Sequence, residues 1–271
     1  MRKIETAQYS EFIAKARANT ANQIYPASIA EGIQEGDIYV SDADDAAAVL
    51  FWHYCGFAFI TGEPSERFLR QLSEDVCFSQ DRRMVLITHD EAVVRFFKDR
   101  GYETGGRIEY CYGEAAGRAP ESDAASGHAP ETESVEGEAF SPFRLERIDR
   151  ENYDRITGRI IPRFSWQSAE EFLKKSFGFA AFEGDTYCGT AFASGISSKE
   201  ADIGVEVVPE YRGRGLASAL VRRACAEALA RGKQPVWDHH ASNIASGRTA
   251  RRCGFVQKQV NTFISVKSAG K

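Results

Sequence analysis

The stretch Val205-Glu-Val-Val-Pro-Glu-Tyr-Arg-Gly-Arg-Gly-Leu-Ala-Ser218 decides what this chain folds into. An apolar strand ends at Pro209, a glycine-rich turn follows, and a long amphipathic helix begins. Glycines let backbone N–H groups approach a ligand closely, and the first turn of a helix offers unpaired N–H donors and a dipole that favours negative charge. The turn therefore predicts a ligand that carries phosphate.

The residues around this turn predict strands before it and alternating helices and strands after it. Glu183-Gly-Asp-Thr separates two strand-like runs in the manner of a hairpin. Ser168-Ala-Glu-Glu has the pattern of a capping box at a helix start. The expected elements, in chain order, are a helical region at 150–176 broken around Ile161-Pro162, strands at 177–182, 187–194 and 202–208, a helix at 215–231, a strand at 235–238, a helix at 243–253 and a strand at 263–266.

The N-terminal half shows a related order of elements, with a helix expected at 65–78, a strand at 84–88, a helix at 90–100 and a strand at 107–112. The run Phe96–Tyr102 resembles Thr249–Phe255, which favours two diverged copies of one unit. The alternative is that helix–glycine–aromatic–strand is simply a common join. The corresponding turn, Thr61-Gly-Glu-Pro-Ser-Glu66, lacks the paired glycines and is acidic, so it should not bind phosphate.

A change of composition at Gly113 predicts the domain organisation. From 113 to 141 only Val135 and Phe140 could anchor a core, so the segment cannot bury enough apolar surface to offset its ordering entropy. We expect an N-terminal α/β domain without a phosphate loop at 1–112, a flexible acidic linker at 113–141, and the domain with the glycine turn at 142–271.

Overall composition excludes several classes of protein. With 271 residues, 43% hydrophobic and 27% charged, the chain is an ordinary globular one, and its net charge of -5 argues against a nucleic-acid partner. No apolar run approaches the roughly 20 residues of a membrane helix, and no signal core follows the N-terminus. The six cysteines show no metal-ligand spacing, so we expect free, mostly buried thiols, no metal site and a cytoplasmic location.

One interpretation of the glycine turn is a dinucleotide fold. Gly213-x-Gly215-x-x-Ser218 approximates the fingerprint, and Asp238 ends the next strand where a ribose-binding acid would sit. Against it, Pro209-Glu-Tyr-Arg separates the strand from the glycines. A doubly wound fold also needs further strand–helix units, for which little chain remains.

A second interpretation fits more of the chain. Arg212, Gly215 and Ala217 meet the pattern Gln/Arg-x-x-Gly-x-Gly/Ala, and a helix, a short strand, Asn243 and a helix ending in Gly254-Phe255 follow. From about Phe143 to Val266 this resembles the GCN5-related N-acetyltransferases (GNAT). The resemblance implies an α/β (α+β) fold with a mixed, mostly antiparallel sheet flanked by helices, to which a smaller N-terminal α/β domain, a candidate degenerate copy, is added. The chain is similar to a branch that includes resistance acetyltransferases for an aminopolyol antibiotic.

The resemblance also implies how acetyl-CoA binds. The backbone near Val207 would pair with the pantetheine arm, backbone amides of the turn would hold the pyrophosphate, and the two arginines would add charge near it. For the arginines simple surface solvation is the alternative, and for Asn243, which matches a cofactor-contacting position, the alternative is helix N-capping. The expected cofactor-binding residues are Val207, Arg212, Gly213, Arg214, Gly215, Leu216, Ala217, Ser218 and Asn243.

Acetyl transfer to an amine needs a base for the amine proton, a polarised carbonyl and a proton for the thiolate. Glu206 is the leading base candidate because it lies on the strand beside the expected thioester, and Asp202 is the second. Many relatives carry a tyrosine in the last helix as the thiolate acid, but Ala250 stands there in this chain. Water or another group, such as His239, would replace it.

We therefore expect an enzyme that transfers an acetyl group from acetyl-CoA to a primary amine of a small molecule, by direct attack in a ternary complex. Two other functions stay open: a non-catalytic acyl-CoA sensor or scaffold, and an NAD(P)-dependent oxidoreductase. Neither the identity of the amine nor the oligomeric state follows from the sequence.

Overall fold

A computed structural model describes residues 1–41, 48–113 and 142–266 of the chain. The segment expected to be a flexible linker lies outside the described residues, apart from Gly113 at its start. The strands are β1 (Arg2–Lys3), β2 (Gly36–Val40), β3 (Ala48–His53), β4 (Phe57–Gly62), β5 (Val85–Thr88), β6 (Thr104–Tyr112), β7 (Arg144–Arg147), β8 (Gly178–Glu183), β9 (Thr186–Ile196), β10 (Glu200–Val207), β11 (Gln234–His240) and β12 (Phe255–Ser265). The α-helices are α1 (Ile13–Arg17), α2 (Ile24–Ala30), α3 (Glu66–Glu74), α4 (Glu91–Lys98), α5 (Ala169–Lys175), α6 (Leu216–Ala230) and α7 (Ile244–Arg252).

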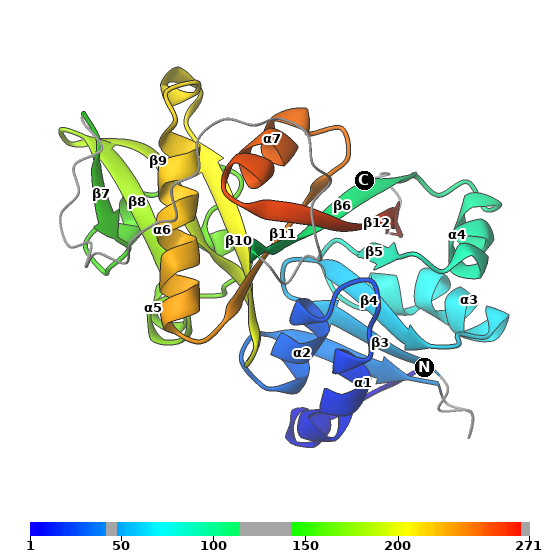
Figure 1. Ribbon diagram of the computed structural model, residues 1–271. Helices are drawn as coiled ribbons and strands as arrows, with labels where there is room; N and C mark the ends of the chain where they lie inside the picture. The colour runs from blue at the N-terminus through cyan, green and yellow to red at the C-terminus, as the bar shows by residue number, and fades with distance from the viewer. Residues whose placement is uncertain (42–47, 114–141, 267–271) are drawn as a thin grey trace.

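All of these strands form one mixed sheet, in the order β1-β2-β3-β4-β5-β12-β6-β11-β10-β9-β8-β7 (Figure 1). Pairing is antiparallel except at two places, where β4 meets β5 and β10 meets β11. The mixed, mostly antiparallel sheet flanked by helices is confirmed. The dinucleotide-fold interpretation is wrong, because the strand before the glycines pairs antiparallel with β9 rather than within a doubly wound parallel sheet.

The two halves exchange strands at the centre of the sheet. β6 of the N-terminal half lies between β11 and β12, and β12 lies between β5 and β6, so the red and teal strands run side by side in Figure 1. The expected boundary after Tyr112 therefore does not separate two sheets. The order β4-α3-β5-α4-β6 recurs as β10-α6-β11-α7-β12, which is the order expected of two diverged copies that have traded their last strands.

The helical region expected at 150–176 is only partly helical. Its second piece is α5, and the Ser168 hydroxyl accepts a hydrogen bond from the Glu171 amide as the capping pattern predicted. The first piece is wrong: this region holds only short 3-10 turns at Tyr153–Arg155 and Pro162–Phe164. The amides of Arg159 and Ile160 bond to the Glu206 side chain instead of to a helix, so the helical ladder does not form.

Two helices position the site. The apolar face of α6 is buried against β8, β9 and β10, as expected of an amphipathic helix, and the helix stands across these strands in Figure 1. α2, which is buried along its whole length, packs against β2 and β3 of the N-terminal half and also against β9 and β10. The N-terminal half is therefore joined to the strand that precedes the glycine turn.

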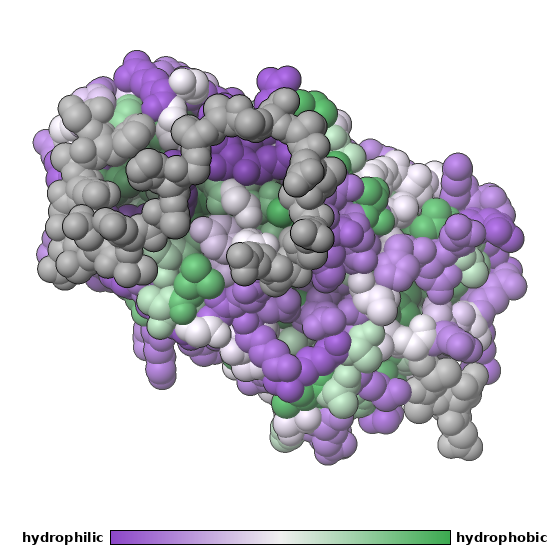
Figure 2. Space-filling view, in the orientation of Figure 1, coloured by the Kyte–Doolittle hydropathy of each residue, from purple (hydrophilic) through white to green (hydrophobic). Residues whose placement is uncertain are grey.

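The surface seen in Figure 2 is mostly hydrophilic, with small separated apolar patches. Among the described residues, the large apolar side chains that are exposed are Phe78, Leu229, Ile244 and Val260. None of the helices described combines the length and apolar content needed to cross a bilayer. All six cysteines are free and five are buried, as expected.

Candidate active site

The strands β10 and β11 separate after a short parallel contact. Residues 200–202 of β10 pair with residues 234–236 of β11. Beyond this contact β11 pairs with β6, which lies on its other side. Because the Val208 amide donates to Cys188 of β9 (2.9 Å), the alternation of an antiparallel pair turns the amides and carbonyls of Val205 and Val207 away from β9. One backbone edge of β10 thus faces the opening between the two strands, where the sequence places the pantetheine arm.

The glycine turn leads from this edge into α6. Gly213 and Gly215 have φ angles of 77° and 82°, a left-handed conformation that glycine adopts without steric cost. Gly215 stands at the N-cap, where it makes no side-chain cap to the helix, so the first amides of α6 keep their capacity to bind a ligand. Open space surrounds the Gly213 Cα on the side where a Cβ would point.

The side chains of the turn contribute differently. Leu216 and Ser218 are buried, at 1% and 6% exposure, so only their backbone amides can face a ligand. Arg212 donates from Nε to the Val207 carbonyl (2.9 Å), which ties the turn back to the end of β10. Arg214 is half-exposed, with its guanidinium over the Tyr211 ring and 3.8 Å from a Glu183 carboxylate oxygen, and its charge remains accessible to an anion.

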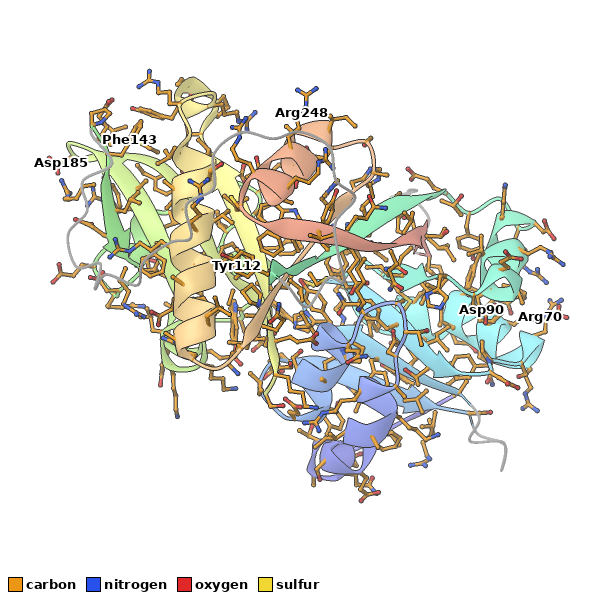
Figure 3. The ribbon with its side chains drawn as sticks, in the orientation of Figure 1. Arg70, Asp90, Tyr112, Phe143, Asp185 and Arg248 are labelled. Atoms are coloured by element: carbon orange, nitrogen blue, oxygen red, sulfur yellow. The ribbon has the colours of Figure 1, made fainter. Side chains whose placement is uncertain are left out.

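Asn243 caps α7. Its side-chain oxygen accepts from the Ser246 amide at 3.1 Å, which confirms the capping role that the sequence left open beside cofactor contact. Figure 3 shows Arg248 of α7 projecting outward from the sheet, while Tyr112 lies at the end of β6 in the middle of the molecule. The cofactor contact of Asn243 stays a prediction.

Asp202 lies at the point where β10 and β11 begin to separate. It is 7% exposed, and its Oδ2 accepts hydrogen bonds from the hydroxyls of Tyr25 (2.6 Å) and Ser194 (2.9 Å). Burial raises the pKa of Asp202 to about 6, although the Tyr25 hydrogen bond lowers it. A carboxylate with this pKa is suited to accept a proton near neutral pH.

Other ionisable groups surround Asp202. Arg107 of β6 forms a partly buried ion pair with Asp238 of β11, and its guanidinium lies 4.8 Å from the centre of the Phe57 ring. Beyond Asp202, the fully buried His53 lies next to Tyr25, with the two ring centroids 4.9 Å apart. Its Nδ1 accepts from the Cys55 amide (3.1 Å), and burial lowers the pKa of His53 to about 3. No sequence pattern signals this group, because its members come from four separate segments of the chain.

Glu206 differs from the expected base. It is half-buried, and its Oε2 accepts from the Arg159 amide (2.7 Å) and the Ile160 amide. Gly158, with φ 136°, brings this segment so close that a Cβ there would lie 3.0 Å from the Glu206 carboxylate. Glu206 thus holds a neighbouring segment in place, and its role as the base stays a prediction.

His239, the candidate to replace the missing tyrosine, faces the opposite side of the sheet from Asp238. Asp238 contacts Arg107, whereas the His239 ring stacks on Tyr110 at 5.4 Å, and its Nε2 lies 3.0 Å from where a Cβ of Gly247 in α7 would be. Successive residues of a strand point to opposite faces, so the two side chains are on opposite sides. His239 is 6% exposed beneath α7, where its ring nitrogens contact the His240 carbonyl (2.8 Å) and the Tyr110 hydroxyl (3.3 Å), and its role as the thiolate acid stays a prediction.

The opening equivalent to the β10–β11 separation is filled in the N-terminal half. β4 and β5 pair only at 57–58 with 85–86, but the Asn19 side chain donates to the Ile60 carbonyl of β4 (2.9 Å), and the Thr20 hydroxyl lies 3.0 Å from His89 after β5. The Ser65 side chain also caps the N-terminus of α3, whereas no side chain caps the N-terminus of α6. The chain's own residues thus occupy this second opening. That the acidic turn binds no phosphate stays a prediction.

Two further features of the surface bear on ligands. A hollow of about 620 Å³ is lined by side chains of α4 and β12, among them Arg95, Lys98 and Thr262, and it shares no residue with the glycine turn. Figure 3 shows Asp90, at the start of α4, on the opposite side of the molecule from α6. Within the described ranges, no group of three His, Cys, Asp or Glu side chains is placed to hold a metal ion.

Comparison with known proteins identifies the class of protein. A family profile described as GNAT acetyltransferase matches residues 14–263, which include both halves, and the chain belongs to this family. The match extends beyond the region 143–266 in which the sequence motif lies, so the strand-exchanged N-terminal half is part of the family's unit rather than an unrelated addition.

Particular relatives agree with this assignment. The chain is 31% identical over 113 residues to the uncharacterized N-acetyltransferase YdfB of Bacillus subtilis (strain 168), a match that covers 41% of this chain and 43% of that protein. A GCN5-related N-acetyltransferase-like protein from Streptococcus suis 89/1591 shares the fold, with a TM-score of 0.70, 19% identity and 96% and 99% of the two chains covered. A tandem GNAT protein from the clavulanic acid biosynthesis pathway, solved without AcCoA, has a TM-score of 0.59, 11% identity and 98% and 96% coverage.

Proposed function

We propose that this protein transfers an acetyl group from acetyl-CoA to a primary amine of a small molecule, by direct attack in a ternary complex. The observation that carries the proposal is the junction of the open edge of β10 with the uncapped start of α6, behind two left-handed glycines. Backbone donors there suit a diphosphate, and the strand edge suits an amide-bearing arm that runs toward Asp202.

Asp202 would accept the proton of the amine. As the amine nitrogen bonds to the thioester carbonyl carbon, its proton passes to the Asp202 carboxylate, and the collapse of the tetrahedral intermediate breaks the carbon–sulfur bond. The departing thiolate takes its proton from water, because α7 presents the buried Ala250 where many relatives have a tyrosine. No covalent enzyme intermediate is required.

Several observations favour a small cationic acceptor. The carboxylates of Asp202 and Asp238 lie beside the point where β10 and β11 separate, and Asp238 is already paired with Arg107. Helix α2 of the N-terminal half packs over β9 and β10 next to Asp202, which restricts the space for a large acceptor. An ammonium group is attracted by an unpaired carboxylate; solvent takes its first proton, and Asp202 takes the second as the neutral amine attacks.

Two measurements test the proposal. Isothermal calorimetry should show binding of acetyl-CoA and CoA but not of NAD or NADP. Release of free thiol should then be followed against a panel of polyamines, amino acids and aminoglycoside-like compounds, with each acceptor omitted in turn as the control. Tight NADP binding without CoA binding would contradict the proposal, as would thiol release that is independent of every acceptor.

A non-catalytic acyl-CoA sensor is a second candidate. Two observations favour it: the absent helix tyrosine at Ala250 and the engagement of the Glu206 carboxylate with backbone amides. This function predicts CoA binding in the calorimeter together with no acceptor-dependent thiol release, a combination that the enzyme function does not allow.

A further inference from the structure

The side chain that meets Asp202 most closely comes from the N-terminal half. Tyr25 of α2 is 2% exposed, and its hydroxyl donates to the Asp202 Oδ2 at 2.6 Å across 177 positions of sequence. Ser194, the extra residue of β9 where its register with β10 shifts, donates to the same oxygen. Both hydroxyls therefore hold one carboxylate oxygen, which leaves Oδ1 as the oxygen for an acceptor's proton.

The N-terminal half's own core holds the Tyr25 ring. The ring stacks on Phe59 at 6.0 Å and meets Phe57 edge-on at 5.3 Å. Asn22 fixes the start of α2, because its side-chain oxygen accepts from the Ile24 amide at 2.9 Å. The position of the hydroxyl is thus set by β4 and α2, independently of the strand that carries Asp202, as a positioning group requires.

We propose that Tyr25 is a positioning residue of the active site: it fixes the orientation of the Asp202 carboxylate and sets the pH at which Asp202 takes the proton of the acceptor amine. This inference rests on the proposed function, in which Asp202 is the base. It assigns the N-terminal half a part in the chemistry, because that half supplies one of the two hydroxyls that hold the Asp202 carboxylate.

The groups that face Asp202 determine the direction of the effect. They are Tyr25 from α2, Cys55 from the turn after β3, Arg107 from β6, Asp238 from β11 and Ser194 from β9, the strand next to that of Asp202. Burial disfavours the charged carboxylate and Asp238 repels it, whereas the hydrogen bonds of Tyr25 and Ser194 and the charge of Arg107 stabilise it. Removal of the Tyr25 hydroxyl must therefore raise the pH at which Asp202 ionises.

The test is Tyr25→Phe, which keeps the ring packing and removes only the hydroxyl. The acidic limb of the kcat profile should move up by about one pH unit, which corresponds to a roughly fivefold loss of kcat near pH 6 and little loss above pH 8. The KM for acetyl-CoA should stay within twofold. Tyr9→Phe is the matched control, because Tyr9 is a buried tyrosine of the same half whose hydroxyl donates to the Gly36 carbonyl, and its limb should not move.

A second readout works without turnover. The Asp202 carboxyl can be titrated by NMR with 13C-labelled aspartate, assigned through Asp202→Asn, in the wild type and in Tyr25→Phe. An upward shift in Tyr25→Phe supports the inference even if no acceptor is found and the proposed function fails. An unmoved titration, or an unmoved kcat limb in an active and folded variant, overturns it, because a purely structural tyrosine would lower only the unfolding temperature.

Discussion

Replacement of Gly215 by valine should separate binding from folding. With φ at 82°, Gly215 sits in a conformation that costs an L-residue about 1–2 kcal/mol, so the free energy of unfolding should fall by about that amount. The side chain would also stand at the mouth of the α6 N-terminus. Loss of two charge-assisted hydrogen bonds to a diphosphate, at about 1.5–3 kcal/mol each, weakens binding by about 100-fold or more.

The control for this substitution is at the other end of the same helix. Gly232 also has a positive φ, 67°, and nothing lies within 4 Å of a Cβ placed there. Gly232→Val should therefore show a similar loss of unfolding free energy, measured by urea denaturation, with an unchanged Kd for acetyl-CoA in the calorimeter. If Gly215→Val binds acetyl-CoA as well as Gly232→Val does, the amides of this turn do not hold the cofactor.

Three other predictions concern ionisable groups. Glu206→Gln should change neither the acidic limb of the kcat–pH profile nor the affinity for acetyl-CoA, whereas Asp202→Asn should abolish acceptor-dependent thiol release. If the acidic limb shifts in Glu206→Gln, Glu206 is the base. Because the folded pKa of Asp202, about 6, lies above its ordinary 3.8, the folded state binds more protons between these pH values and wild-type stability falls as the pH rises through them. The free energy of unfolding of Asp202→Asn, measured in urea, should therefore rise by about 2 kcal/mol relative to that of the wild type between pH 4 and pH 8. If the two proteins differ in this free energy by the same amount at both pH values, the reasoning is refuted. For His53 the folded pKa, about 3, lies below 6.5, so the unfolded state takes the proton first and stability falls as the pH drops below 6.5. Between pH 7 and pH 4 the free energy of unfolding of His53→Gln should fall by about 3 kcal/mol less than that of the wild type. If both proteins lose the same free energy of unfolding, His53 is protonated in the folded protein.

Local patterns predicted most elements around the glycine turn well. The strand–turn–helix from 205 to 230, the capping of α5 by Ser168 and the capping of α7 by Asn243 depend on residues a few positions apart, and each is present. The helix expected near 150–161 failed for a non-local reason. The side chain of Glu206 takes the amides of Arg159 and Ile160, and nothing in the intervening sequence signals that partner.

The candidate base shows the same limit. The sequence placed Glu206 and Asp202 on one strand and ranked Glu206 first, because Glu206 lies beside the expected thioester in an otherwise apolar run. Their surroundings differ: backbone amides engage Glu206 at half-exposure, whereas Asp202 is enclosed by Tyr25, Ser194 and the ion pair of Arg107. Proton affinity depends on burial and neighbours, and these are properties of the folded chain.

The sequence alone determined that a glycine-rich turn joins an antiparallel hairpin to a long helix, because glycine conformation, capping and helical periodicity are encoded within a few residues. Only the tertiary structure decided that β6 and β12 change places between the halves, that residues 19–21 fill the second opening, and that α2 brings Tyr25 to Asp202. Strand pairing and burial unite residues more than a hundred positions apart, and the free energy that selects one such pairing comes from the whole core rather than from any local stretch.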